Sequence, residues 1–481
     1  MTSIVWFRDD LRLADNPALR WAAKQGPLIA LYLYDDATAG LRPLGGAQRW
    51  WLKQSLIALD MSLRDKGGQL MIAQGDPATI IVDLVAKTKA SAVSWNRIYS
   101  EPAMERDTAL KALLSARGLK VQTFNANLIH EPVKVKNQSG SNFKVFTPFW
   151  KAISAEHISP PVPIPELSFS ATSLGMNISS LPLNPTPVDW ATGWGRLHAP
   201  GEAGAHRQLE SRYETIFNGY SDDRNLPGTE GTSRLSPHLR FGEISPRQVW
   251  HKTLAALESH GPQKGIERNA WAFLREIGWR EFSHYLLYHF PLLGSQNWRS
   301  EFDQFPWQNN PAFIDAWQGA KTGYPIVDAG LRELWQTGWM HNRVRMIVAS
   351  FLIKHLMVDW RVGEAWFWDT LIDACPANNT ASWQWVAGSG ADASPYFRIF
   401  NPITQSEKFD PNGSYVRRWV PELERLDDRL VHQPWEAPAL VLHAAGIQLG
   451  PGYPHPIVDH HTARQTALDA YETIKKKSPA S

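Results

Sequence analysis

The feature that most constrains the fold is a regular alternation of short apolar runs with helical patterns up to about residue 125. Five apolar runs, each bounded by Gly, Pro, Asp or Asn, are predicted to be β-strands: Ser3–Phe7, Leu28–Tyr34, Gln69–Ala73, Ala92–Trp95 and Lys120–Phe124. Because helical crossovers join parallel strands, the alternation predicts an α/β domain with a doubly wound parallel sheet, which we place at residues 1–130. No Gly-x-Gly-x-x-Gly follows the first run, so a standard dinucleotide site is not expected there.

The rest of the chain changes character twice. Seven prolines, many serines and few charges between residues 155 and 190 indicate a connection that is neither one helix nor a central strand. We place the interdomain linker at residues 131–195. Beyond it the apolar spacing is helical almost throughout, which predicts an all-α domain at residues 196–481. On the helix expected after His341, the face that carries Asn342, Arg345 and Met346 is unusual for a solvent surface.

Composition narrows the class of protein. The single cysteine, Cys375, excludes a disulfide framework, a cysteine-based zinc site and a four-cysteine iron–sulfur cluster, and we expect no metal. The formal charge of +2 means that nucleic-acid binding would require a local basic patch. Early charges such as Arg8 and Asp9 leave no room for a signal-peptide core, and the longest apolar stretch, Met346–Ile353, is too short for a bilayer. We therefore expect a soluble, cytoplasmic protein.

Four segments of the helical region carry polar residues in patterns that suit a ligand. Gly231–Ser236 supplies hydroxyls and backbone N–H groups, which can cradle a phosphate but more often cap a helix. Glu276–Phe282 alternates acid, aromatic and base, which also fits a structural ion pair beside a core Trp. Trp339–Met346 concentrates cationic and amide groups, and its like charges repel unless an anion or a carboxylate relieves them. Asp369–Pro402 mixes amides with aromatics and suits either a planar ligand or a polar core network.

Several stretches together carry a resemblance to a known family. They occur in one order along the chain: WFRDDLRLADNPAL, EGTSRLSPHL, WREF, KTGYPIVDAG, GWMHNRVRM, DWR, ASWQWVAG, GADA, PYFRIFNP and YPHPIVDHH. Over nearly the whole chain they resemble the DNA photolyase/cryptochrome flavoproteins, most of all the bacterial cyclobutane pyrimidine dimer (CPD) photolyases of class I or class III. The resemblance implies the α/β domain, the linker and a helical domain that binds FAD.

By this resemblance, two groups of residues bind FAD. The phosphate and ribityl group comprises Tyr220, Thr232, Ser233, Arg234, Leu235 and Ser236. The isoalloxazine group comprises Phe273, Arg280, Asn342, Arg345, Asp373, Cys375 and Asn379. Arg345, paired with Asp373, would favour the anionic reduced flavin FADH⁻, and Asn379 would lie near flavin N5.

The implied activity is light-driven DNA repair by a lyase, with FAD as the blue-light chromophore. Excited FADH⁻ would donate an electron to a pyrimidine dimer flipped out of UV-damaged DNA. Glu276 would hydrogen-bond the thymine carbonyls as negative charge develops, and Trp279 and Trp385 would stack against the dimer. The remaining substrate and DNA contacts implied are Asn342, Met346, Arg224, Arg343, Arg398 and Gln405.

The resemblance also assigns an electron-transfer chain and shows two departures from the family pattern. Trp383, Trp360 and Trp307 correspond to the chain from the flavin to the surface, although core packing is the commoner role of an arbitrary Trp. Cys375 stands where the family commonly has a second carboxylate, and we expect the missing negative charge to favour the anionic over the neutral semiquinone of the flavin. Phe273 stands where many relatives have Trp, which keeps a ring but loses an N–H donor.

An antenna chromophore is the family's second cofactor, commonly 5,10-methenyltetrahydrofolate. Glu105 lies where folate-binding relatives place a glutamate that contacts the pterin. Its neighbour is Met104 rather than the usual Asn, so a deazaflavin, no antenna, and a plain solvated Glu105 all stay open.

Three other functions share parts of this pattern. A cryptochrome photoreceptor would keep fold and flavin without repair, but the lesion residues named above argue against it. A (6-4) photolyase usually has a histidine pair where this chain has Asn342 and Arg343 after His341. A flavin-free structural or RNA-binding protein would leave the buried polar groups as a core network. We therefore expect a CPD photolyase that acts as a monomer on UV-damaged DNA, without a membrane.

Overall fold

The computed structural model describes residues 2–185, 190–261, 263–393 and 397–477. The N-terminal part of these residues forms a five-stranded parallel sheet in the order β3-β2-β1-β4-β5. Its strands are β1 (Ser3–Phe7), β2 (Leu28–Tyr34), β3 (Leu70–Gln74), β4 (Ala92–Asn96) and β5 (Lys120–Phe124). The predicted doubly wound parallel sheet is confirmed, and each predicted strand lies within one residue of the observed one.

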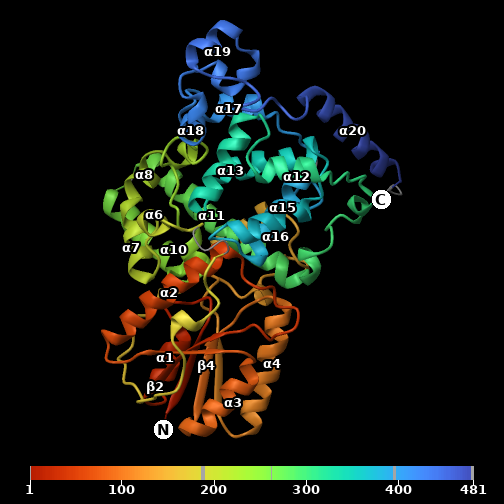
Figure 1. The fold of residues 1–481 in the computed structure, drawn as a ribbon. Coiled ribbons are helices and arrows are strands. Elements are labelled where there is room, and N and C mark those ends of the chain that lie inside the picture. The colour runs from red at the N-terminus through yellow and green to blue at the C-terminus, as the bar shows by residue number, and fades with distance from the viewer. Residues whose placement is uncertain (1, 186–189, 262, 394–396, 478–481) are drawn as a thin grey trace. The chain divides into compact units, whose positions relative to one another are not determined.

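Helices connect the strands (Figure 1): α1 (Pro17–Ala23), α2 (Gly46–Arg64), α3 (Pro77–Thr88) and α4 (Glu101–Ala116). Side-chain caps begin two of them, because Asn16 accepts the N–H of Leu19 and Asp76 accepts the N–H of Thr79, each followed by a proline. The strand order reverses between β1 and β4, where doubly wound sheets open a crevice at the carboxyl ends of the strands.

The chain divides into two compact units, each assembled from segments distant in sequence. Unit 1 comprises Met1–Phe217, Ser233–Pro291 and Ile372–Cys375. Unit 2 comprises Asn218–Thr232, Leu292–Leu371 and Pro376–Ser481. The predicted linker belongs to unit 1, and its boundaries at residues 131 and 195 stay a prediction.

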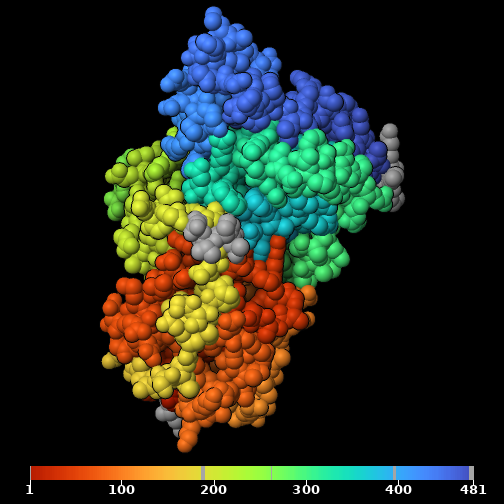
Figure 2. All heavy atoms as spheres, in the orientation of Figure 1, coloured from red at the N-terminus to blue at the C-terminus, as the bar shows by residue number. Residues whose placement is uncertain are grey.

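The linker packs back onto the sheet domain. After α5 (Phe146–Ala155), Phe169 forms a β-bridge with Leu28, and Met176 forms one with Ile72. The Phe169 ring lies so close to Gly68 that a Cβ there would overlap it. Figure 2 shows part of this connection, in yellow, lying on the surface of the α/β domain. The part of the connection around Phe169 and Met176 therefore packs against the sheet domain.

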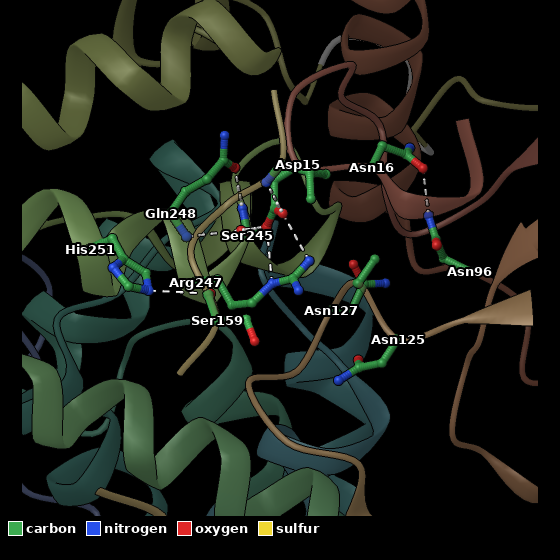
Figure 3. Close-up of polar contacts among 12 residues, drawn as sticks. Asp15, Asn16, Asn96, Asn125, Asn127, Ser159, Ser245, Arg247, Gln248 and His251 are labelled. Atoms are coloured by element: carbon green, nitrogen blue, oxygen red, sulfur yellow. Dashed lines mark hydrogen bonds and ion pairs between the residues drawn. The ribbon is translucent and has the colours of Figure 1, made fainter. Parts of the chain in front are cut away.

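The loop after β1 is the polar hub of unit 1 (Figure 3). Asp15 is fully buried, has a φ of +51°, and accepts hydrogen bonds from Ser245 Oγ at 2.5 Å and Arg247 Nη2 at 2.8 Å. It also accepts the N–H of Val162 in the linker at 3.0 Å. The guanidinium of Arg12, also fully buried, donates to two backbone carbonyls at 2.8 Å. These bonds join the β1 loop, the linker and α10 within one unit.

Helices make up most of the remaining chain, as predicted for the all-α part. Those of unit 1 are α6 (Trp194–Leu197), α7 (Glu202–Ser211), α9 (Ser236–Arg240), α10 (Pro246–His260) and α11 (Lys264–His289), while α8 (Tyr213–Asp223) contributes to both units. Those of unit 2 are α12 (Pro311–Gln318), α13 (Pro325–Thr337), α14 (Asn342–Ser350), α15 (Trp360–Thr370), α16 (Pro376–Ala387), α17 (Pro402–Phe409), α18 (Ser414–Trp419), α19 (Ala439–Ala445) and α20 (His460–Lys477). A π-helical turn, Phe351–His355, continues α14.

Candidate functional site

Helix α9 holds the segment that carries two predicted flavin residues of unit 1. Ser236, the first residue of α9, donates its hydroxyl to Oδ2 of Asp373 at 2.6 Å. Arg240, one turn later, donates from Nε to the carbonyl oxygen of Ala374 at 2.9 Å. Cys375, the next residue, is buried. The same short helix therefore fixes both the side chain of residue 373 and the backbone of residue 374.

The turn before α9 offers donors to an anion. Arg234 has a φ of +53°, a left-handed conformation that is uncommon for a side chain other than Gly. Among the described residues, the backbone N–H groups of Thr232, Ser233 and Ser236 donate to no protein acceptor, and buried Leu235 caps the helix. Backbone N–H groups that have no protein acceptor suit a phosphate ester, so the chemistry of the turn fits the diphosphate of FAD.

Four predicted residues follow one side of α11, namely Phe273, Glu276, Trp279 and Arg280. Phe273 is buried, while Glu276 and Trp279 are half-buried. The indole of Trp279 stacks on the ring of Phe146 in α5, with 3.6 Å between ring centroids and 10° between planes. One indole face is covered by protein, which fixes the plane of the ring.

Arg280, which is half-buried, forms an ion pair with its buried neighbour Glu281. Arg280 Nη1 donates to the backbone carbonyl of Asn127 at 2.7 Å and lies 3.4 Å from Oε1 of Glu281. Burial lowers the pKa of the Arg280 guanidinium, which also interacts electrostatically with Cys375. Burial raises the pKa of Glu281 to about 7. The sequence analysis missed Glu281, although it belongs to the WREF motif.

Asn379 is the most tightly oriented predicted flavin residue of unit 2. Its side-chain nitrogen donates to the backbone carbonyl of Glu364 at 3.0 Å and to the carboxylate of Glu364 at 2.8 Å. Both acceptors are oxygens, so the amide orientation is set, and Oδ1 accepts no hydrogen bond among the described residues. Such an oxygen fits a protonated flavin N5. Glu364 was missed, because nothing in the sequence connects it to Asn379.

The other predicted flavin residues of unit 2 lie on α8 and α14. Tyr220 is buried in α8, and Asn342 is exposed at the start of α14. Arg345 donates from Nε to the carbonyl of Met340 at 2.7 Å. Arg345 and Asp373 belong to different units, so their pairing stays a prediction.

Two predicted DNA-binding arginines act on each other in unit 2. Burial and the charge of Arg224 lower the pKa of Arg343. Arg343 donates to Oδ1 of Asn225 at 2.6 Å, and its guanidinium lies 4.4 Å from the ring centroid of Phe409. It also donates to the sulfur of Met346, 3.7 Å away. The sequence analysis did not identify Phe409. Its ring stacks with the Arg343 guanidinium and so holds Arg343 beside the like charge of Arg224. A bound anion would relieve the repulsion between the two arginines.

The three tryptophans of the predicted electron-transfer chain belong to neighbouring parts of unit 2. Trp383 packs on Gly363 of α15, which begins at Trp360. The backbone next to Trp307 is tied to the approach to α15, because the N–H of Gln308 donates to the carbonyl of Met357 at 2.8 Å. Trp383 and Trp360 are buried and Trp307 is half-buried. Their role as an electron-transfer chain stays a prediction.

Trp385 and Arg398 line one small cavity of about 30 Å³ in unit 2. Arg398 is exposed, and Gln405 is half-buried on α17. Trp385 and Arg398, both predicted to contact the DNA substrate, therefore line the same cavity.

The predicted antenna residue, Glu105, is exposed on α4. The residues beside it turn inward: Arg106 pairs with Asp35 and Asp107, and Asp107 also pairs with Arg8 at 2.7 Å. This network lies by the carboxyl ends of β1 and β4, because Arg8 directly follows β1 and donates to the carbonyl of Asn96, the last residue of β4.

Comparison with known proteins gives one consistent result. Two family descriptions match the chain, "DNA photolyase" at residues 3–167 and "FAD binding domain of DNA photolyase" at residues 273–473. The chain is 51% identical to the deoxyribodipyrimidine photo-lyase of Agrobacterium fabrum, with 98% of both chains covered. It is 39% identical to cryptochrome-1 of Arabidopsis thaliana, and the match covers 100% of this chain and 71% of that protein. It superposes on a bacterial class III photolyase from Agrobacterium tumefaciens with a TM-score of 0.94, at 50% identity, over 99% of this chain and 98% of that one.

The chain therefore belongs to the DNA photolyase/cryptochrome family, as the sequence predicted. It shares that family's FAD-binding domain. No helix in the described ranges is both long and apolar enough to cross a membrane.

Proposed function

We propose that the protein is a deoxyribodipyrimidine photo-lyase that uses blue light to split CPDs in UV-damaged DNA. The observation that carries this proposal is the 51% identity to a photo-lyase over 98% of both chains, against 39% identity to a cryptochrome. The solved relative of class III favours that class over class I.

FAD is the cofactor, and the residues present suit it. The N–H groups of the turn before α9 would hold its phosphates, with Tyr220 and Arg234 beside them. Asn379 would present Oδ1 to N5, while Phe273, Arg280, Asn342, Arg345, Asp373 and Cys375 would surround the ring. When bound in its reduced form FADH⁻, FAD supplies the light-excited electron that opens the cyclobutane ring.

The chain's own groups bind and orient the lesion. Glu276 would donate a hydrogen bond to the dimer carbonyls, where negative charge develops, so it must hold a proton at its carboxyl group. Trp279 and Trp385 would stack on the dimer and exclude water, with Met346 beside them.

Basic and amide groups would hold the flanking DNA. Arg224 and Arg343 would take a phosphate between them, which relieves their mutual repulsion. Arg398 and Gln405 would contact the backbone near the Trp385 wall. We propose that the protein does this as a monomer in the cytoplasm, where it meets damaged DNA of the nucleoid.

Two further assignments follow from the family. Trp383, Trp360 and Trp307 would pass electrons between flavin and surface. Glu105 would contact a methenyltetrahydrofolate antenna. A deazaflavin is the alternative antenna.

The decisive experiment measures CPD loss from a UV-irradiated thymine oligonucleotide with reduced protein, in blue light and in matched darkness. Repair in light alone is expected, and it should fall at least tenfold in Glu276→Ala. A protein that holds photoreducible FAD yet repairs nothing would contradict the proposal and point to a photoreceptor. Repair of (6-4) photoproducts instead would point to the other repair class.

A further inference from the structure

The π-helical turn after α14 buries a lysine. Lys354 is 2% exposed, although an isolated ammonium is costly to remove from water. Its Nζ donates to the backbone carbonyl of Arg398 and lies 4.5 Å from the ring centroid of Phe397. Both compensating contacts come from the same segment, Phe397–Phe400. Single π-helical turns within helices occur frequently at functional sites.

A second side chain binds the same segment. Ser350, four residues before Lys354, accepts the N–H of Phe400 at 3.3 Å. On the other side, the ring of Phe397 stacks on Tyr471 of α20 with 3° between planes. The segment is therefore held at its backbone by one helical face and at its aromatic ring by another helix.

The lysine also lines the cavity that Trp385 and Arg398 share. The other polar residues that line this cavity are Ser350 and Asp392. A volume of about 30 Å³ admits one water molecule. Lys354 thus contacts the backbone of Arg398 and lines the same cavity as Trp385.

We propose that Lys354 is a positioning residue for lesion binding, which sets the Arg398 guanidinium beside Trp385 by holding the Phe397–Phe400 segment. The ligand part of this proposal rests on the proposed function, since it takes the DNA phosphate next to the lesion as the partner of Arg398. The grip on the segment is a property of the protein alone.

The charge of Lys354 gives the proposal a pH dependence. Burial and the charge of Arg398 lower the pKa of Lys354 to about 7. The charged and titratable groups around it are Arg398 and Asp392 at the cavity, His355 on its own turn, His460 bonded to His355, and Tyr471 behind Phe397. Below pH 7 the ammonium strengthens both contacts, and above pH 7 the cation–π contact is lost. We expect lesion affinity to weaken as the pH rises from 6 to 8.

The first test needs no DNA. Trypsin cleaves after Arg398, at the carbonyl that Lys354 holds. We expect Lys354→Met holoprotein to be cut there about tenfold faster than wild type, the cost of one charge-assisted hydrogen bond, and Ser350→Ala to change the rate less. FAD content and the melting temperature show that each variant is folded. Equal rates of cleavage after Arg398 in the wild type and in folded Lys354→Met would show that Lys354 does not hold this segment.

The second test is a double-mutant cycle on the Kd for a duplex with a single CPD. Lys354→Met and Arg398→Gln should each weaken binding about tenfold, and the double variant should be no weaker than Arg398→Gln. Lys354→Arg should restore affinity and remove its pH dependence. Additive losses would show that Lys354 does not act through Arg398. If the wild-type protein binds the CPD duplex no better than undamaged duplex, the proposed function is contradicted. The trypsin cleavage rates would then still test whether Lys354 holds the Phe397–Phe400 segment.

Discussion

The side-chain nitrogen of Asn379 donates to two oxygens of one residue, the backbone carbonyl and the carboxylate of Glu364, at 3.0 and 2.8 Å. Replacing Glu364 by Ala removes the second bond and lets the amide rotate, so Oδ1 no longer faces N5 reliably. A hydrogen bond of this kind is worth about 1 kcal/mol, and we expect the reduced flavin to re-oxidise in the dark about fivefold faster. Glu364→Gln keeps an acceptor oxygen and is the control; the same acceleration in both variants would contradict the mechanism.

Cys375 provides a second prediction, because the family commonly has a carboxylate there. Cys375→Asp adds a negative charge near the proposed flavin ring, which disfavours an anionic reduced flavin. The midpoint potential of bound FAD should fall by about 30–60 mV, the equivalent of roughly 1.4–2.8 kcal/mol for a two-electron couple. Cys375→Ser changes no charge and should leave the potential in place. Redox titration of both variants decides, and an unchanged potential in Cys375→Asp would refute the charge argument.

Glu281 makes stability depend on pH. Its pKa is about 7 in the folded protein against an ordinary 4.5, mainly because of burial. Between these values the folded chain keeps a proton that the unfolded chain has lost, so the free energy of unfolding decreases as the pH rises from about 4.5 to 7. This contribution reaches up to about 3 kcal/mol.

Glu281→Gln should therefore flatten the dependence of the melting temperature on pH in that window. The slope is the quantity to compare, because the variant also changes the partner of Arg280. Glu267→Gln, an exposed position on the same helix, is the matched control and should retain the wild-type slope.

Gly363 is the contact surface of Trp383. A Cβ at Gly363 would overlap the indole and lie 2.6 Å from Leu352 Cδ2. Gly363→Ala should destabilise the protein by about 1–3 kcal/mol and displace Trp383, which slows photoreduction of the flavin. Gly265→Ala, on a helix where a Cβ meets nothing within 4 Å, should leave photoreduction unchanged. A wild-type rate of photoreduction in Gly363→Ala would contradict a role of Trp383 in electron transfer to the flavin.

The sheet was predictable because parallel strands are buried on both faces and stand out as continuous apolar runs such as Leu28–Tyr34. The linker was predictable only as a connection. Its bridge from Phe169 to Leu28 pairs residues far apart in the chain, and no local pattern encodes such a contact. For the same reason the sequence identified Asn379 by resemblance but not its partner Glu364.

Local pattern also concealed Lys354. In the sequence it ends an apolar stretch, as an ordinary solvated lysine does. Its burial depends on the π-helical turn and on the Phe397–Phe400 segment more than 40 residues later. Helical periodicity does not distinguish a π-turn from the α-helix it continues.

The hub at Asp15 and Arg12 limits how such proteins can be recombined. A chimera that takes its first strand and following loop from a relative imports a buried guanidinium whose carbonyl acceptors lie at Ala126 and Gly242. It also imports a buried carboxylate whose donors are Ser245 and Arg247. Exchange of the α/β domain alone would leave these groups without matched partners. A productive crossover must carry the linker and the start of α10 together with the first strand.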